Sequence, residues 1–438
     1  MESVWNIGMK KPDFKALKGD IKTDVLIIGG GISGILCGYM LQNAGVDYVI
    51  AEQNTICSGV TQNTTAKITY HHGAIFDKML KRFGKDTLSL YLKAHNEALG
   101  DYRNMCESID CDYTNTDSYV YSLNNPKKIE NEVKALNEAG ITAEFVNDLP
   151  LPFKVSGAVK VKNQAQFNPL KFLYSIAKEL NIYENTKILE LQPNGAKTEY
   201  GKIIAQKTIV ATHFPIFNKH GGYFLKMYQH RSYVLALKNA QNVNGIYVDE
   251  KDTGLSFRNY NDLLLLGGGG HRTGKNGGNY NELRHFANIN YPLSKEITHF
   301  ATQDCKTLDD IPYIGQYSKN TPNLYVATGF NKWGMTSALV SAKLLCDLVT
   351  NKDNIYKEIF SPSRTIIRPQ LVINGTEALA NLLTPTKPRC PHLGCALKYN
   401  KAEHSWDCPC HGSRFSESGK LLNNPATSDK KLLKKDFL

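Results

Sequence analysis

The stretch from Ile27 to Gly34 reads Ile-Ile-Gly-Gly-Gly-Ile-Ser-Gly and constrains the fold more than any other part of the chain. It ends an apolar run and opens a segment whose apolar residues recur at helical spacing, which predicts a strand, a tight turn and a helix. Gly29 permits the turn, Gly31 lets the backbone approach a pyrophosphate, and Gly34 lets the helix pack closely on the strand. The first N–H groups of that helix then point at the phosphates. The pattern predicts a dinucleotide site.

A second apolar run, Tyr48 to Ala51, ends in Glu52, which lies 23 positions after Gly29. At this distance an acid is placed to accept a hydrogen bond from a ribose hydroxyl, and this argues against a plain glycine-rich turn. The 22 residues from Val25 to Val46 carry no charge, so a membrane span is the alternative. Six glycines within them and an uninterrupted fingerprint favour strand, turn and helix.

The size and charge of the chain limit the number of domains and the kinds of partner that we expect. The chain has 438 residues, 42% of them hydrophobic, which suffices for two or three globular domains. The net charge of +11 is spread without a clustered patch, so we expect no nucleic-acid partner. The closing lysines Lys430, Lys431, Lys434 and Lys435 predict a solvated end or a dock for an acidic redox partner. No basic segment followed by an apolar one opens the chain, so we expect a cytoplasmic protein without a membrane span.

The middle of the chain mixes helices and strands. Two helices have clear start signals, Asn125-Pro126 and Asn168-Pro169. From Tyr228 to about His271 the residues alternate in β fashion, which predicts a sheet facing the cofactor. The four glycines Gly267 to Gly270 are too flexible for a strand interior, so we expect a tight bend beside the cofactor or a loop.

A second strand-to-helix junction follows near the end of this module. The strand Leu324 to Thr328 leads through Gly329 into a helix that begins around Thr336. A helix N-terminus at this place stabilises negative charge on a bound group.

The order of these motifs resembles the D-amino acid oxidase family of flavoproteins, the glycine or sarcosine oxidase group, over roughly Asp24 to Leu348. The resemblance implies FAD. Its adenosine diphosphate end would be held by Gly29, Gly31, Ser33, Gly34 and Glu52. Its ring end would be touched by Thr64, Thr65, Ala66, Lys67, Gly329, Gly334, Met335 and Thr336.

Members of this family typically oxidise a carbon–nitrogen bond of an amine or amino acid by hydride transfer to the flavin N5 atom. They commonly hold the substrate carboxylate with an arginine, and the candidates here are Arg231, Arg258 and Arg272. No general base is evident.

Near the C-terminus stands a box of two cysteines and two histidines. Cys390 and His392 form C-x-H, and after fifteen residues Cys408 and His411 form C-x-x-H. This set suits a [2Fe-2S] cluster in which the cysteines hold one iron and the histidines the other. Zinc is the alternative, but zinc fingers space cysteines as C-x₂₋₄-C and histidines as H-x₃₋₅-H.

The box resembles Rieske proteins of the respiratory cytochrome bc type, which implies a disulfide between Cys395 and Cys410. Ser413 is placed to donate to a bridging sulfide, but Phe415 stands where high-potential members carry tyrosine, so we expect a lower potential. Only a short stretch separates the box from the flavin module. The usual strand-rich base must therefore be abridged, and the cluster loops should lean on the flavin module.

The fold class expected is α/β (α+β): a Rossmann-like FAD domain with an interleaved β-sheet substrate domain, plus a small abridged Rieske-type β domain. The expected boundaries are 1–360 for the flavin module, with FAD-binding parts at about 20–75, 185–220 and 305–350, then 361–388 for a linker and 389–438 for the Rieske domain.

The resulting hypothesis is a dehydrogenase. It would oxidise an amine or amino-acid-like small molecule and pass electrons from the flavin to the cluster and then to an electron carrier or quinone. Two alternatives use the same residues: a reductase running in the opposite direction, and a redox-sensing or structural protein with bound FAD and a cluster or zinc.

Overall fold

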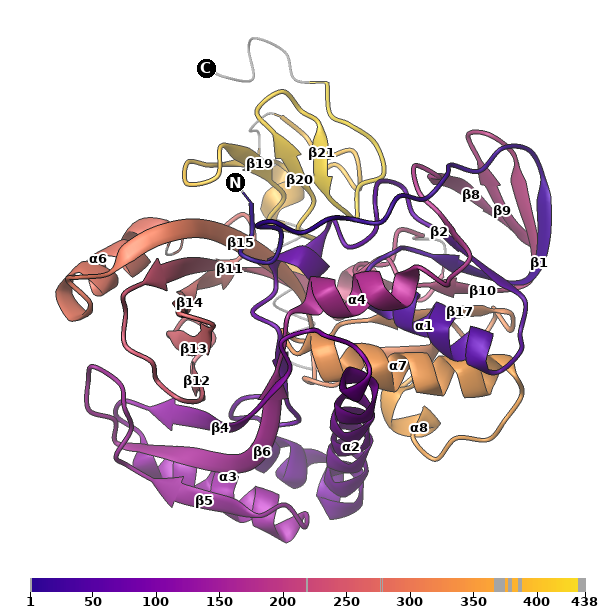
Figure 1. Cartoon of the computed structure of the whole chain (residues 1–438). Coiled ribbons are helices and arrows are strands. Elements are labelled where there is room, and N and C mark those ends of the chain that lie inside the picture. The colour runs from indigo at the N-terminus through magenta and orange to yellow at the C-terminus, as the bar shows by residue number, and fades with distance from the viewer. Residues whose placement is uncertain are drawn as a thin grey trace.

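A largely parallel sheet begins at the glycine motif and forms the first layer of the protein (Figure 1). The computed structural model describes residues 2–217, 220–275, 277, 279–365, 375–376, 380–384 and 388–431. The sheet runs β16-β17-β10-β1-β2-β7, with β9 also paired to β10 and β8 to β9. Its strands are β1 (Ile21–Ile28), β2 (Tyr48–Ala51), β7 (Ile182–Tyr183), β8 (Ile188–Gln192), β9 (Gly195–Thr198), β10 (Lys202–Val210), β16 (Tyr313–Gln316) and β17 (Leu324–Thr328).

Helices cover this sheet and connect it to a second one. Helix α1 packs against α7 and α4 beside the parallel strands (Figure 1). The described helices are α1 (Ile32–Asn43), α2 (Phe76–Glu107), α3 (Pro126–Glu138), α4 (Pro169–Ala177), α5 (Tyr223–Lys226), α6 (Tyr280–Asn290), α7 (Gly334–Val349), α8 (Lys357–Phe360) and the 3-10 turn η1 (Val60–Asn63). None of them has the length and apolar composition that a bilayer-crossing helix needs.

The predicted helix starts at Asn125 and Asn168 are confirmed. The Asn125 side chain accepts a hydrogen bond from the Lys128 N–H, and the Asn168 side chain accepts from the N–H groups of Leu170 and Lys171. Each cap satisfies backbone donors that have no partner inside the helix.

The second sheet is long and mostly antiparallel, in the order β15-β11-β14-β13-β12-β4-β6-β3, with β5 paired to β6. Its strands are β3 (Lys67–Ile68), β4 (Thr114–Ser122), β5 (Ala143–Val146), β6 (Gly157–Gln166), β11 (Met227–Lys238), β12 (Ile246–Asp249), β13 (Ser256–Tyr260), β14 (Leu263–Arg272) and β15 (Lys295–Thr307).

The prediction for Gly267 to Gly270 is wrong, because all four lie inside β14. Crowding explains their presence in a strand. A Cβ on Gly267 would lie 2.5 Å from the Ser256 hydroxyl, and one on Gly270 would lie 2.4 Å from the Asp252 carbonyl oxygen. The glycines are therefore needed because neighbouring atoms leave no room for side chains at these positions of the strand.

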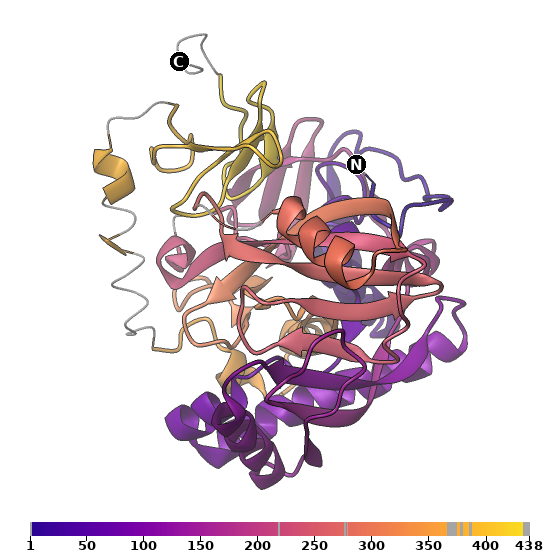
Figure 2. The same ribbon diagram turned by 90° about the vertical axis from the view of Figure 1, so that its left-hand side faces the viewer.

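A small third sheet near the C-terminus lies over the edge of the second one. It runs β18 (Lys398–Asn400), β19 (Ser405–Asp407), β20 (Arg414–Ser416) and β21 (Leu421–Asn423), all antiparallel. Figures 1 and 2 both show it against β11 and β15. Much of the linker expected over 361–388 lies outside the described residues, as do Lys434 and Lys435.

Candidate functional site

The glycine turn between β1 and α1 leaves no room for side chains. Gly29 has φ +110°, and a Cβ there would lie 2.7 Å from the Ala211 carbonyl oxygen. A Cβ on Gly34 would lie 1.8 Å from the Gly29 carbonyl oxygen, so α1 could not approach the strand. Thr61, from the polar stretch that follows the second strand, accepts a hydrogen bond from the Ile32 N–H at 3.1 Å. The turn therefore presents bare backbone to whatever binds above it.

Above this turn opens a cavity of about 710 Å³. Glu52 lines it, and its carboxylate accepts hydrogen bonds from the N–H groups of Gly30 (2.7 Å) and Asn54 (2.8 Å). Burial raises the pKa of Glu52. Ten of the thirteen residues predicted to bind the cofactor line this cavity: Gly29, Gly31, Ser33, Glu52, Thr64, Thr65, Lys67, Gly329, Gly334 and Met335.

The other three predicted residues lie behind the cavity wall. Gly34 packs on the turn, and Ala66 is fully buried while its carbonyl accepts a hydrogen bond from Arg258. Thr336 is buried and donates to the Thr69 carbonyl at 2.9 Å. They support residues that face the cavity.

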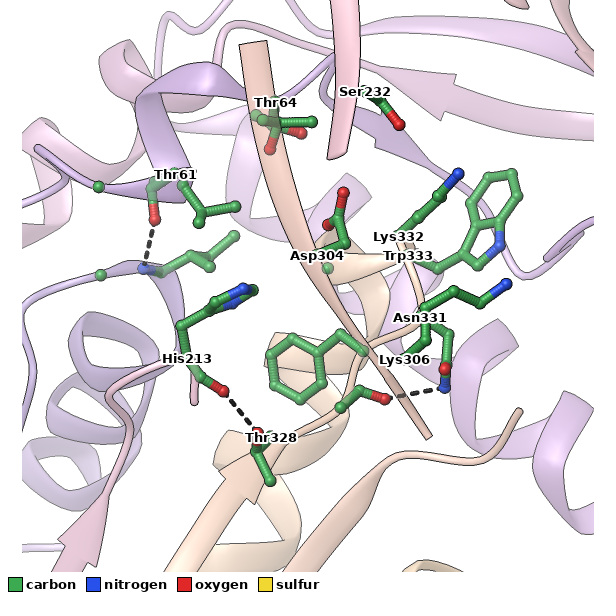
Figure 3. Close-up of a pocket in the computed structure, with 18 of the residues that line it drawn as sticks. Thr61, Thr64, His213, Ser232, Asp304, Lys306, Thr328, Asn331, Lys332 and Trp333 are labelled. Atoms are coloured by element: carbon green, nitrogen blue, oxygen red, sulfur yellow. Dashed lines mark hydrogen bonds between the residues drawn. The ribbon is translucent and has the colours of Figure 1, made fainter. Parts of the chain in front are cut away.

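The part of the cavity around Asp304 and Lys332 is rich in charge (Figure 3). Burial, together with repulsion from nearby Arg258 and Lys332, lowers the pKa of Lys67 to about 7. Asp252 forms ion pairs with Lys306 and, at 3.7 Å, with Lys332. Burial raises the pKa of Asp304 to about 6, although Lys332 and Lys306 act in the opposite direction. Lys332 lies in the turn from Gly329 to Thr336, which was predicted to touch the ring end of the cofactor. The two aspartates were not predicted from sequence, because no local motif marks them.

Aromatic side chains wall the same part of the cavity. Trp333 stacks on the His72 ring at a centroid distance of 5.2 Å, and a His72 ring nitrogen lies 2.7 Å from the Tyr91 hydroxyl. His213 also lines the cavity, in a left-handed conformation with φ +66°. Burial lowers the pKa of His213 to about 4, so its imidazole is neutral at physiological pH.

The three arginine candidates for a substrate carboxylate are used elsewhere. Arg258 donates to the carbonyl oxygens of Thr65 and Ala66, both at 2.7 Å, and so holds the loop that precedes Lys67. Arg231 pairs with Glu403, and Arg272 donates to the Cys410 carbonyl at 3.4 Å. Within the described part of the chain, no arginine lines the cavity.

The C-terminal box folds into two neighbouring loops. A disulfide joins Cys395 to Cys410, as the Rieske resemblance implied. The sulfurs of Cys390 and Cys408 share a hydrogen bond, and backbone N–H groups of each loop point at its own cysteine sulfur. The hydrogen bond from Cys408, with these N–H groups and the Ser413 hydroxyl, lowers the pKa of Cys390 to about 7. These donors stabilise the Cys390 thiolate, the form that ligates iron, whereas the shared hydrogen bond and burial raise the pKa of Cys408.

The two histidines complete the donor set. The rings of His392 and His411 lie 4.9 Å apart at 82° to each other. His411 is 4% exposed, and its Nδ1 atom has no hydrogen-bond partner among the described residues. The Cys408 sulfur lies within 4.8 Å of the sulfurs of Cys395 and Cys410. Because those two sulfurs are bonded to each other, they are not free to ligate a metal. The remaining donors are Cys390, Cys408, His392 and His411. This set fits a [2Fe-2S] cluster with mixed ligands.

The cluster loops contact the outer face of β11 and β15, which confirms that they lean on the flavin module. Gln229 donates to the His411 carbonyl at 2.7 Å, and Gln303 donates to the Gly412 carbonyl at 2.8 Å. The nearly buried Arg231–Glu403 ion pair joins the same two surfaces. Both glutamines and Arg231 lie on one face, because Arg231 is paired with Gln303 in the strand register.

The opposite face of the same two strands forms the cavity wall. Ser232 is paired with Thr302, and both line the cavity together with Asp304. Alternate residues of β15 therefore face the cavity and the cluster loops. A single sheet layer therefore separates the cavity from the cluster loops. The C-terminal domain also lines the cavity directly, through Leu422, Asn423, Asn424, Ala426 and Thr427.

Comparisons with known proteins agree with this architecture. A family model described as FAD dependent oxidoreductase (DAO) matches residues 24–348, and a Rieske [2Fe-2S] domain model matches residues 363–434. The Bacillus subtilis (strain 168) Rieske 2Fe-2S iron-sulfur protein YhfW is 35% identical over 97% of this chain and 96% of its own length.

Solved structures share the fold of the larger part. Glycine oxidase from Geobacillus kaustophilus has a TM-score of 0.66 at 17% identity, covering 79% of this chain and 99% of its own. L-amino acid deaminase from Proteus vulgaris has a TM-score of 0.65 at 19% identity, covering 82% of this chain and 97% of its own.

The fold and the two sites define a flavin-dependent oxidoreductase with an iron–sulfur domain at its C-terminus. The chain belongs to the DAO family of FAD-dependent oxidoreductases and carries a Rieske domain. Its cofactors are accordingly FAD and a [2Fe-2S] cluster.

Proposed function

We propose that the protein is a dehydrogenase that oxidises an amine or amino-acid-like substrate in the flavin cavity and exports the electrons through its Rieske cluster. FAD accepts a hydride and the cluster transfers single electrons, so the pair converts a two-electron oxidation into one-electron steps. A soluble electron carrier or a quinone is the acceptor in this proposal, and the cytoplasm is its location.

One observation carries the proposal: β11 and β15 serve both sites at once. Ser232 and Asp304 line the cavity, while Gln229 and Gln303 hold the backbone beside His411 from the other face. Neighbouring sheet layers pack about 10 Å apart, so a single intervening layer keeps the two sites close. A cluster with only a structural function would need no such placement.

Two cysteines and two histidines of the C-terminal box ligate the cluster. Cys390 and Cys408 hold one iron and His392 and His411 the other, while the disulfide clasps the two loops. Ser413 hydrogen-bonds toward Cys390 and accepts from the Ala426 N–H at 3.0 Å, which orients its hydroxyl.

The flavin side follows the glycine turn and the two polar loops. The backbone of Gly29 and Gly31 takes the pyrophosphate, and Glu52 takes the ribose. The N-terminus of α7 at Gly334 supplies positive potential, which stabilises negative charge on a reduced cofactor, and the protonated fraction of Lys67 adds to it.

The test is anaerobic stopped-flow mixing of the holoprotein with a panel of amines and amino acids. We expect flavin bleaching, followed by a slower change in the visible absorption and EPR signal of the cluster. In His411→Cys the first phase should remain and the second should change in rate or potential.

Two results would contradict the proposal. One is a flavin that is reoxidised by oxygen alone while the cluster stays oxidised. The other is a His411→Cys variant with unchanged kinetics in both phases. Reduction of the flavin by a pre-reduced cluster, without any response to amines, would support flow in the opposite direction.

A further inference from the structure

The charged side chains around Asp304 differ from those that a carboxylate-binding site requires. Arg231, Arg258 and Arg272 are all engaged outside it, and within the described part of the chain no arginine reaches the cavity. Asp304 points its carboxylate into the cavity, with Lys332 and Thr64 on either side (Figure 3). A substrate group that binds here meets a negative charge.

Asp304 is also unlike its neighbour Asp252. Asp252 pairs with both Lys306 and Lys332, and these cations hold its pKa well below the usual range against the effect of burial. Among the described residues, none forms an ion pair or a hydrogen bond with the Asp304 side chain. An enclosed carboxylate without a partner costs free energy, which a cationic ligand recovers.

The surrounding cations do not remove this preference. Lys306 and Lys332 form their ion pairs with Asp252 and attract the Asp304 carboxylate only from beyond ion-pair distance. Lys67 has a pKa of about 7, so a large fraction of it is neutral at physiological pH. Asp304 itself, with a pKa of about 6, is mostly ionised there. Its other charged neighbours are Arg231, which pairs with Glu403 across the sheet, and the like-charged Asp252. His230, its partner in the strand register, is neutral because burial lowers its pKa to about 2.

We propose that Asp304 determines substrate specificity by binding an ammonium group, so that the substrate is a cationic amine whose recognition needs no carboxylate. The hydroxyls of Ser232 and Thr302 line the adjoining wall and can accept further N–H hydrogen bonds. This inference rests on the proposed function and narrows its substrate class from amines and amino acids to amines.

The test uses two probes of the same shape and opposite charge, tert-butylamine and pivalate. Neither can be oxidised at its polar group, because the carbon next to that group carries no hydrogen. Each is titrated into oxidised, FAD-loaded holoprotein at pH 7.5, and binding is followed by the flavin difference spectrum and by calorimetry. We expect tert-butylammonium to bind more tightly than pivalate.

Asp304→Asn should weaken tert-butylammonium binding by about 30-fold or more, because it removes one member of an enclosed charge pair. The matched control is Asp249→Asn, since Asp249 is another carboxylate that lines the cavity and keeps its Oδ1 hydrogen bond to the Lys251 N–H. That control should change the affinity less than threefold. FAD content and the cluster EPR signal verify that both variants are folded.

Tighter binding of pivalate to the unmodified protein would overturn the inference, as would equal losses in the two variants. The comparison of the two probes on the unmodified protein decides the matter even if Asp304→Asn loses its FAD. Photoreduction of the flavin without any substrate tests electron transfer to the cluster separately, so failure of this inference is distinguishable from failure of the proposed function.

Discussion

The Arg231–Glu403 ion pair should hold the Rieske domain on the flavin module, and its strength follows from the structure. The side chains are 6% and 12% exposed, so solvent screens the pair little. Burial alone would raise the pKa of Glu403, but Arg231 and Arg414 lower it to about 2 from its ordinary 4.5. The difference corresponds to about 3 kcal/mol of stabilisation at neutral pH, shared between the two arginines.

Replacing Arg231 by Met should therefore cost about 2 kcal/mol, because Glu403 keeps its contact with Arg414 at 3.1 Å. For a domain of this size, such a loss lowers the melting midpoint by about 10 °C. The assay is thermal loss of the visible absorption of the cluster, recorded in parallel with release of FAD fluorescence. The cluster midpoint should fall more than the FAD midpoint.

The matched control is Arg284→Met. Arg284 makes a two-pronged pair with Glu296, at 2.7 and 2.8 Å, but both residues belong to the flavin module. If Arg231→Met lowers the cluster midpoint no more than Arg284→Met, the reasoning is refuted. The dependence on pH is a second check. Since the folded-state pKa of Glu403 is depressed, its contribution is complete above pH 4.5 and is lost as the pH falls toward 2.

Three further predictions follow from individual residues. Gly34→Ala should abolish FAD binding, measured as FAD per protein, because its Cβ would meet a backbone carbonyl at 1.8 Å; Gly100→Ala, at a position of α2 where a Cβ meets nothing within 4 Å and which does not line the cavity, should retain FAD. Replacing both Cys395 and Cys410 by Ser should destabilise the Rieske domain by about 3 kcal/mol, since the disulfide closes a 15-residue loop, and this loss is measured as a lower thermal midpoint of the cluster absorption. Affinity for tert-butylammonium should rise as the pH increases through about 6, where Asp304 ionises, and Asp304→Asn should flatten this profile.

Features set by local chemistry were open to prediction from sequence. The turn at Gly29 to Gly34 and the caps at Asn125 and Asn168 depend on residues within a few positions of one another, so their spacing reveals them. The pairing of Cys395 with Cys410 came from the wider pattern of the C-terminal box, which the resemblance supplied.

Features that depend on contacts between distant segments could not be predicted from the sequence. Arg231 lies 172 positions from Glu403, and nothing near it in the sequence says that it is committed to a domain interface. Arg258 likewise serves the backbone of a loop more than 190 positions earlier. The four glycines of β14 misled for the same reason, because the atoms that crowd Gly267 and Gly270 come from other strands and loops.

The strand β15 shows how closely the two sites are tied together. Its side chains alternate, so Thr302 and Asp304 belong to the cavity while Gln303 contacts the cluster loop. A slip of one residue in its pairing with β11 would exchange these assignments, placing a carboxylate against the Gly412 carbonyl and an amide in the cavity. The register of this one strand pair therefore sets both the charge that Asp304 presents in the cavity and the attachment of the Rieske domain. A substitution on one face of the strand changes only the cavity or only the domain contact, whereas a change of register alters both.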